Sequence, residues 1–282
     1  MKFDENLSSI HAYLCGDGYV IKHPPNIKRK YYKMGFRNTN IVLLKDFQRK
    51  FKRRFKLEPH IFKTERCYIA NKEIYYHLTK NFSYYSYEWR MPRLSKNNLR
   101  HWLRSFYDCE SWIYNKKAKN RHIGLECVNL YGLKQIKQGL YKFKISSSDI
   151  KIRKRKHGII YRLSIFGLDN LKKFDKYIGY HHPNKKRNLK EAINSYTSYN
   201  WNIPFKKRDL SNFVNKKGRI SHKRNEVRFY TIKLNNLIIL RRILKRYKIN
   251  SSIQGPSKNG NGNIYYILRF RFNHNKLKLG KF

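Results

Sequence analysis

The chain has 282 residues, enough for one large domain or two to three smaller ones, and 40% of them are hydrophobic. Lysine and arginine number 65 against 17 aspartates and glutamates, which gives a formal net charge of +48. The apolar content excludes a disordered basic tail, and the charge favours nucleic acid as the partner over an anionic membrane, because basic residues run along the whole chain.

The first half of the chain alternates helical and extended patterns. Apolar spacing and turn residues predict its elements in this order: a short helix at 9–17, an extended run at 31–36, a helix at 40–55, strands at 60–65 and 66–71, and a helix at 72–82. A linker that contains Pro92 follows at 87–95.

The second half repeats this order. The pattern predicts a short helix at 99–110, a strand at 121–128, a helix at 130–143, a hairpin with strands at 149–154 and 159–166 joined at Lys156, His157 and Gly158, and a helix at 168–179. Two α-β-β-α-β-β-α units of about 90 residues therefore follow one another.

A basic helical segment at 184–196 opens the last third of the chain. After an extended connection at 201–204 come a strand at 227–234, a helix at 235–249, a strand at 251–256, a Gly/Asn turn at 258–263 and a strand at 264–270. This region resembles the repeat without its leading acidic helix. We therefore expect an α+β protein with halves at 1–92 and 93–182 and a basic, DNA-binding partial third repeat at 183–282.

The sequence offers no sign of a membrane or disulfide protein. No stretch approaches the roughly 20 apolar residues of a membrane span, and the first residues carry acids where a secretion signal carries basic residues. We expect a cytoplasmic protein with no membrane partner. The four cysteines form no C-x-x-C pair, so we expect neither a zinc site nor disulfides.

The two leading helices share a pattern. Residues 10–18 read IHAYLCGDG and residues 103–111 read LRSFYDCES. Each carries small residues four apart, where two helices can approach closely, and an acid next in sequence. The small residues are Ala12, Gly16, Ser105 and Cys109, and the acids are Asp17 and Glu110. Packed side by side, the helices would bring both acids to one end of a shared interface.

Two converging carboxylates favour a divalent cation between them. Oxygen ligands from Asp17 and Glu110, with a substrate phosphate, suit Mg²⁺ or another divalent cation. Such a site would catalyse phosphodiester hydrolysis. The plain alternative is that Asp17 is an ordinary acid at a helix end and Glu110 an exposed helix acid, although the helix dipole disfavours an acid at a C-terminus.

The paired segments resemble the two LAGLIDADG motifs of homing endonucleases, and the resemblance covers residues 1 to about 180. It implies that the motif helices form the interface between pseudo-symmetric halves and that the strands form a saddle over the DNA major groove. It also implies that the final acids, Asp17 and Glu110, bind the metals that cleave opposite strands. Two motifs in one chain imply a monomer that reads a long, asymmetric target, spread by intron or intein homing.

The resemblance also implies polar or basic residues near the metals. By repeat position the candidates are Arg37, Asn38 and Asn129, of which we assign the two asparagines to catalysis and Arg37 to DNA binding. Ser111 stands where the motif normally ends in glycine, which leaves reduced or lost cleavage open.

Alternating basic residues mark one strand as a DNA-facing element. Lys151, Arg153 and Arg155 alternate along it and project to one face, as a groove-reading strand requires. The plain alternative for such basic runs is a solvated face. Asp108 is interpreted as structural, and the adjacent His181 and His182 as part of a loop rather than metal ligands.

Composition and motifs together predict a site-specific double-strand DNA endonuclease. Two alternatives share the fold: an RNA maturase that assists intron splicing, and a non-cleaving DNA-binding regulator derived from an endonuclease. A basic structural RNA-binding protein would explain the charge, but it leaves the paired helices unexplained.

Overall fold

The computed structural model describes residues 2–22, 31–116, 120–155, 158–196, 201–258 and 264–271. The chain divides into two compact units, Met1–Tyr196 and Thr197–Phe282. The boundary therefore lies after residue 196 rather than at the expected 183, because the helix that opens the last third packs against the first unit. Within the described residues, no helix is both long and apolar enough to cross a bilayer.

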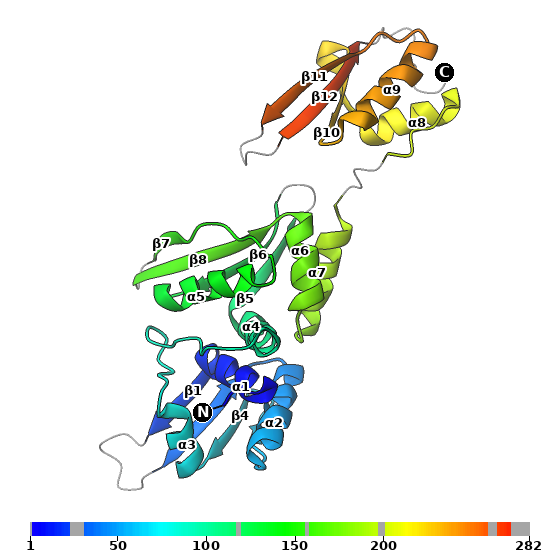
Figure 1. The fold of residues 1–282 in the computed structure, drawn as a ribbon. Helices are drawn as coiled ribbons and strands as arrows, with labels where there is room; N and C mark the ends of the chain where they lie inside the picture. The colour runs from blue at the N-terminus through cyan, green and yellow to red at the C-terminus, as the bar shows by residue number, and fades with distance from the viewer. Residues whose placement is uncertain are drawn as a thin grey trace. The chain divides into compact units, whose positions relative to one another are not determined.

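The first unit repeats one order of elements twice (Figure 1). The first half comprises α1 (Glu5–Cys15), β1 (Gly18–Lys22), β2 (Tyr32–Arg37), α2 (Ile41–Phe55), β3 (His60–Phe62), β4 (Arg66–Ala70) and α3 (Lys72–Thr79). The second comprises α4 (Lys96–Glu110), β5 (Ser111–Lys116), β6 (Asn120–Cys127), α5 (Leu130–Tyr141), β7 (Lys151–Arg155), β8 (Gly158–Phe166) and α6 (Leu168–Tyr177), and α7 (Pro183–Asn194) follows. The predicted α+β class and α-β-β-α-β-β-α order are confirmed.

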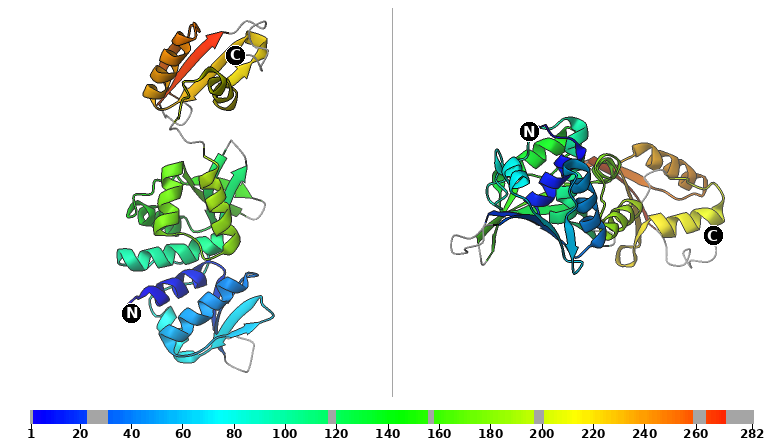
Figure 2. Two further views of the ribbon diagram at one scale, coloured as in Figure 1. Left: turned by 90° about the vertical axis from the view of Figure 1, so that its right-hand side faces the viewer. Right: turned by 90° about the horizontal axis from the view of Figure 1, so that it is seen from below.

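The two sheets of the first unit have the same topology. Their strand orders are β1-β2-β4-β3 and β5-β6-β8-β7, with every neighbouring pair antiparallel. In each half the helices cover one face of the sheet (Figure 2). Alternate strand residues such as Met34 and Phe36, or Leu163 and Ile165, are buried on that face. We call the opposite face of each sheet its open face.

Local signals explain where the helices of each half begin. Asn40 and Asn129 stand before α2 and α5, and each side chain accepts a hydrogen bond from a backbone N–H of the first turn. The strands β1 and β5 were not located from the sequence. The strand β5 follows α4 directly, and only the two-residue turn of Gly16 and Asp17 separates β1 from α1, so no longer loop marks where either strand starts.

The second unit contains α8 (Lys207–Lys217), β9 (Arg219–Ser221), a short 3₁₀ turn η1 (His222–Arg224), β10 (Glu226–Thr231), α9 (Leu234–Arg246), β11 (Ser252–Lys258) and β12 (Ile264–Arg271). Its strand order, β9-β10-β12-β11, matches that of both sheets in the first unit. The core lies between one sheet face and the two helices, where Val214 of α8 and Leu240 of α9 meet Phe229 and Leu268.

The repeat in the second unit is thus more complete than expected. It was predicted to lack the leading helix, but α8 occupies that place. A Cβ added to Gly218, directly after α8, would lie 2.6 Å from the carbonyl oxygen of Val214. A Cβ on Gly18 would likewise collide with Leu14, also four residues earlier. This helix was not recognised from the sequence, because Lys217 stands where the other two leading helices have the acids Asp17 and Glu110. Within the predicted turns, residues 156, 157 and 259–263 lie outside the described part of the chain.

Candidate active site

The helices α1 and α4 pack against each other at backbone distance. A Cβ added to Gly16 would lie only 2.7 Å from the Cβ of Cys109. Ala12 and Ser105, one turn earlier on each helix, are completely buried. The structure therefore brings together the four small residues that the sequence singled out, at a crossing directly before the two acids.

This close approach makes Gly16 sensitive to a single added methyl group. We expect Gly16→Ala to destabilise the protein by about 1–3 kcal/mol, because the neighbouring helix must move. Gly139→Ala in α5 is the matched control. Its added Cβ would have Leu99 as nearest neighbour at 3.4 Å, and the change should stabilise by roughly 0.5–1 kcal/mol. Urea denaturation of both variants measures the difference, and equal stabilities would contradict the close packing.

Each acid lines a pocket beside the sheet of its own half. Asp17 lies in the turn after α1, where its carbonyl oxygen accepts a hydrogen bond from the Arg37 N–H at 3.1 Å. It lines a pocket of about 700 Å³ on the open face of the first sheet. Glu110 is the last residue of α4 and lines a pocket of about 540 Å³ bordered by Trp112 and Arg155 of the second sheet. Figure 1 shows α1 and α4 side by side between these sheets.

Burial sets the charge state of both acids. It raises the pKa of Asp17, although the hydrogen bond from Asn38 and the Lys185 ammonium lower that pKa in part. Burial and then the nearby charge of Asp17 raise the pKa of Glu110 to about 7. The two carboxyl groups are therefore close enough to repel each other, which is the condition that favours a bound cation.

Asn38 holds the first acid directly. Its Nδ2 donates to Oδ2 of Asp17 at 3.0 Å, while its Oδ1 accepts from the N–H of Asn40 at 2.9 Å. These two hydrogen bonds fix both the amide and the carboxylate it faces. The structure thus places Asn38 beside Asp17, as the repeat position indicated.

Asn129 does not reach the acids. Its Oδ1 caps α5 through the Gly132 N–H, and its Nδ2 donates to the carbonyl oxygen of Trp89 at 2.6 Å. The assignment of Asn129 to catalysis is corrected, because strand register makes it the counterpart of the helix cap Asn40. The true counterpart of Asn38 is Cys127, since Gly18 pairs with Phe36 and Ser111 with Leu125.

Lys185 of α7 is a half-buried cation near the site that the sequence did not reveal. Its Nζ donates to the backbone carbonyl oxygens of Asp108 at 2.6 Å, Cys109 at 3.2 Å and Tyr107 at 3.3 Å, at the end of α4. Its charge lowers the pKa of both Asp17 and Glu110. In the sequence it belongs to a run of basic residues that resembles a solvated face. Only the folded structure shows that Lys185 turns toward the site while Lys186 and Arg187 are exposed.

Asp108 anchors the segment that delivers Lys185. Its carboxylate accepts hydrogen bonds from the backbone N–H groups of His181 and His182 at 3.0–3.2 Å. These backbone contacts give Asp108 the structural position that was expected of it. Among the described residues, no group of three or more His, Cys, Asp or Glu side chains is placed to hold a metal ion.

Ser111 is accommodated by a difference between the two motifs. The helix α1 ends at Cys15 and the chain turns before Gly18, which has no room for a Cβ. The helix α4 instead continues to Glu110. The Ser111 Oγ then donates to the Tyr107 carbonyl oxygen at 2.6 Å, so a side chain fits where the first motif needs glycine.

Basic and aromatic side chains cover both open faces. Lys33 lies over the ring of Tyr68 at 4.0 Å, and Arg37 over that of Tyr19 at 5.3 Å. On the second sheet, Lys151, Arg153 and Arg155 are all exposed on β7 and share the open face, as their alternation predicted. Glu126 of β6 pairs with three arginines there: Arg153 at 3.9 Å, Arg155 at 2.7 Å and Arg162 at 2.6 Å.

Comparison with protein families matches part of the chain. Residues 97–179, which contain the second motif, match the model of the LAGLIDADG-like domain, so the predicted resemblance is confirmed over these residues. No curated protein matches the chain.

Several solved structures are similar to the chain. The homing endonuclease I-DmoI in complex with DNA and Ca is 19% identical, with a TM-score of 0.48 over 66% of this chain and 99% of its own. I-WcaI bound to its DNA recognition sequence is 15% identical, with a TM-score of 0.45 over 67% and 88%. Full-length DUF199/WhiA from Thermatoga maritima is 12% identical, with a TM-score of 0.44 over 77% and 68%.

Proposed function

We propose that this chain, a member of the LAGLIDADG family through its domain at residues 97–179, is a site-specific, divalent-metal-dependent endonuclease of double-stranded DNA. The observation that carries the proposal is the placement of Asp17 and Glu110. Both are largely buried beside the crossing of α1 and α4, and each opens onto a sheet face rich in basic residues. One chain supplies both acids, which supports a monomer acting on an asymmetric target.

The residues present fit a divalent cation. Asp17 and Glu110 supply the hard carboxylate oxygens that Mg²⁺ prefers, and their mutual repulsion disfavours the metal-free charged pair. The remaining ligands would come from substrate phosphate and water, because two side chains alone leave the coordination shell incomplete. When bound, the cation would activate water and stabilise the leaving oxygen of phosphodiester hydrolysis.

The residues around Asp17 and Glu110 would orient the two carboxylates and bind the DNA phosphates. Asn38 holds the Asp17 carboxylate in one orientation, and the close packing at Gly16 and Cys109 fixes the two acids relative to each other. Lys185 adds a half-buried positive charge that favours their ionised forms. The exposed cations of the two open faces would hold DNA phosphates and so set the scissile groups over the acids.

A cleavage selection tests the proposal. The full chain is incubated with Mg²⁺ and a library of random duplex sequences, and cut ends are sequenced. Enrichment of one long asymmetric site supports the endonuclease. Duplex binding without cleavage at any metal concentration would favour a non-cleaving regulator, and tight binding to intron RNA without duplex cleavage would favour a maturase.

The pKa of Glu110 predicts how cation binding depends on pH. Because the carboxyl must lose its proton to bind the cation and its pKa is raised to about 7, affinity should be full above that pH. Below it, affinity should fall roughly tenfold per pH unit for each proton that competes. Calorimetric titration with Mg²⁺ between pH 8 and pH 5.5 measures this slope. Glu110→Gln should remove the step near pH 7, and an affinity constant across the range would contradict the assignment.

A further inference from the structure

The helices α8 and α9 both pack against one face of the sheet in the second unit, and no helix among the described residues covers the other, open face. The covered face carries Val227 and Phe229 of β10 and Leu268 and Phe270 of β12, which are buried against α8 and α9. Side chains alternate along a strand, so the intervening residues of β10 and β12 point to the open face.

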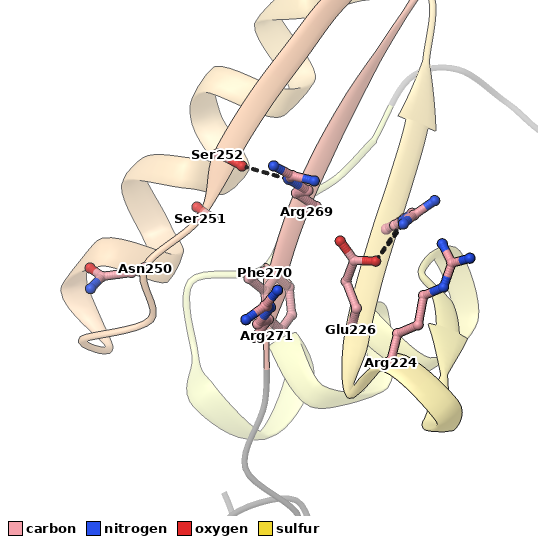
Figure 3. Close-up of a pocket in the computed structure, with 9 residues that line it drawn as sticks. Arg224, Glu226, Asn250, Ser251, Ser252, Arg269, Phe270 and Arg271 are labelled. Atoms are coloured by element: carbon pink, nitrogen blue, oxygen red, sulfur yellow. Dashed lines mark hydrogen bonds and ion pairs between the residues drawn. The ribbon is translucent and has the colours of Figure 1, made fainter.

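That open face is dense in arginine. Arg228 of β10 pairs in register with Arg219 of β9 and Arg269 of β12, which places all three on one face. Arg228 and Arg269 line a shallow pocket of about 790 Å³ together with Arg224 and Arg271. Figure 3 shows Arg224, Arg269 and Arg271 around this pocket, with Arg269 donating to the Ser252 hydroxyl at 3.2 Å.

A single acid organises this cluster. Glu226, which is 7% exposed, accepts a hydrogen bond from Arg228 at 2.7 Å (Figure 3). Asp209 and Glu226 are the two acids of the sequence from residue 197 onward. One carboxylate cannot neutralise five guanidinium groups, so the cluster keeps a net positive charge and spare donors for an oxyanion.

Strand pairing allows the open face of the second unit to be compared, residue by residue, with the open face of the first sheet, where Asp17 lies. Arg228 occupies the place of Gly35, because Gly35 pairs with Tyr19, the residue after Gly18, and Arg228 pairs with Arg219, the residue after Gly218. By the same pairing, Arg269 occupies the place of Tyr68 and Arg271 that of Ala70. Arginines therefore replace small and aromatic residues of the site-bearing half.

The helix α8 has lost what makes α1 part of a metal site. When Gly218 is aligned with Gly18, Lys217 takes the position of Asp17, because each is the residue before its glycine. Asn212 and Lys216 stand at the positions of Ala12 and Gly16, and both are exposed where the earlier pair faces α4. An ammonium group at this helix end is also favoured by the helix dipole. The unit thus keeps the sheet and loses both the acid and the helix-pairing surface.

We infer that the second unit is a binding module that grips the phosphodiester backbone of duplex DNA through this arginine face and does not cut it. The inference rests on the proposed function for the identity of the polymer. Charge complementarity selects the occupant: rows of guanidinium groups on a sheet match repeated phosphates, which arginine binds with paired donors. The unit would add phosphate contacts to those made by the first unit.

Two matched variants of the full chain test this inference. The sheet-face variant carries Arg219→Gln, Arg224→Gln, Arg269→Gln and Arg271→Gln, and it spares Arg228 so that Glu226 keeps its partner. The control variant removes the same charge from exposed positions of α9: Arg241→Gln, Arg242→Gln, Lys245→Gln and Arg246→Gln. Fluorescence anisotropy with a labelled duplex in EDTA, over a salt series, gives the affinity and its salt dependence. Thermal melts compare the folding of all three proteins.

The sheet-face variant is expected to bind duplex DNA roughly ten- to a hundredfold more weakly and to lose about three from the slope of log affinity against log salt. The control should lose far less of both. Parent-like affinity and slope in the sheet-face variant would overturn the inference, as would equal losses in the two variants. If the sheet-face variant melts early, Arg269→Gln and Arg271→Gln are tested singly against Arg241→Gln by the same criteria.

Two further measurements separate this inference from the proposed function. At saturating protein, the sheet-face variant should cut as the parent does, because Asp17 and Glu110 lie in the other unit. If Asp17→Asn cuts as the parent does while the sheet-face variant loses binding as expected, the proposed endonuclease site is wrong. The inference about the arginine face is then still supported. A binding loss confined to a structured RNA probe, with duplex affinity intact, would instead assign the face to RNA and overturn the inference.

Discussion

Asp17→Asn is expected to reduce duplex cleavage at least about a thousandfold while leaving duplex binding near that of the parent. The change removes one charged oxygen from the pair that would hold the cation, and losing several kcal/mol of transition-state stabilisation corresponds to this factor. The amide keeps the size of the carboxylate and can still hydrogen-bond to Asn38, so the fold should persist. Single-turnover cleavage of the selected target, beside anisotropy binding, measures both effects.

The control is an acid elsewhere in the same unit. Asp149, whose side chain is fully exposed and pairs with Lys137 at 2.8 Å, loses the same charge in Asp149→Asn and should cut at the parental rate. Glu110→Gln should behave as Asp17→Asn does, because the two acids flank one helix crossing. If both acid variants retain cutting within about tenfold of the parent, the active site has been placed wrongly.

Much of this site could be anticipated because its signals are local in sequence. The pairs Ala12 and Gly16, and Ser105 and Cys109, follow the helical repeat, so spacing alone placed them on one face before each acid. The repeated element order then implied that the two helices pack together. The order of elements was predicted correctly because apolar periodicity within a short stretch of sequence distinguishes helix from strand. The first residue of a strand such as β1, which begins at Gly18, depends instead on where the preceding helix ends.

The residues that escaped prediction are fixed by contacts between distant segments. Asn129 follows Glu110 at nearly the distance at which Asn38 follows Asp17, but strand pairing makes Cys127, two residues before Asn129, the counterpart of Asn38. Lys185 reaches the end of α4 only because Asp108 holds the turn before α7, 73 and 74 residues away along the chain. Neither relation leaves a mark in a single sequence.

The second large expected effect concerns stability. Asp46→Ala should destabilise the protein by about 3–5 kcal/mol, because it leaves the Lys50 ammonium buried and unpaired. Asp46 and Lys50 are each only 6% exposed, and Asp46 also accepts from the Tyr13 hydroxyl at 2.9 Å and from Arg49. This cluster ties α2 to α1 and so supports the helix that carries the first acid. Urea denaturation at pH 7 measures the loss.

An exposed pair beside the same helix gives the matched control. Lys52 and Glu58 are 62% and 50% exposed, so Glu58→Ala should cost at most about 1 kcal/mol. A double variant, Asp46→Leu with Lys50→Met, should recover most of the loss, since a buried ion pair replaced by apolar groups is often neutral. If the double variant is as unstable as Asp46→Ala, the pair itself, rather than an orphaned charge, stabilises the fold.

The pH dependence of that loss distinguishes the ionised pair from packing alone. Burial raises the pKa of Asp46, but the Lys50 ammonium and the Arg49 guanidinium outweigh it and hold the pKa below its ordinary value of 3.8. A carboxyl with a lowered pKa contributes stability above that ordinary value, and the contribution disappears as pH falls through the lowered one. The difference between parent and Asp46→Ala should therefore be constant from pH 7 to about pH 5 and shrink below pH 3.8. A difference that stays constant into the acid range would show that side-chain volume, not charge, holds α2 against α1.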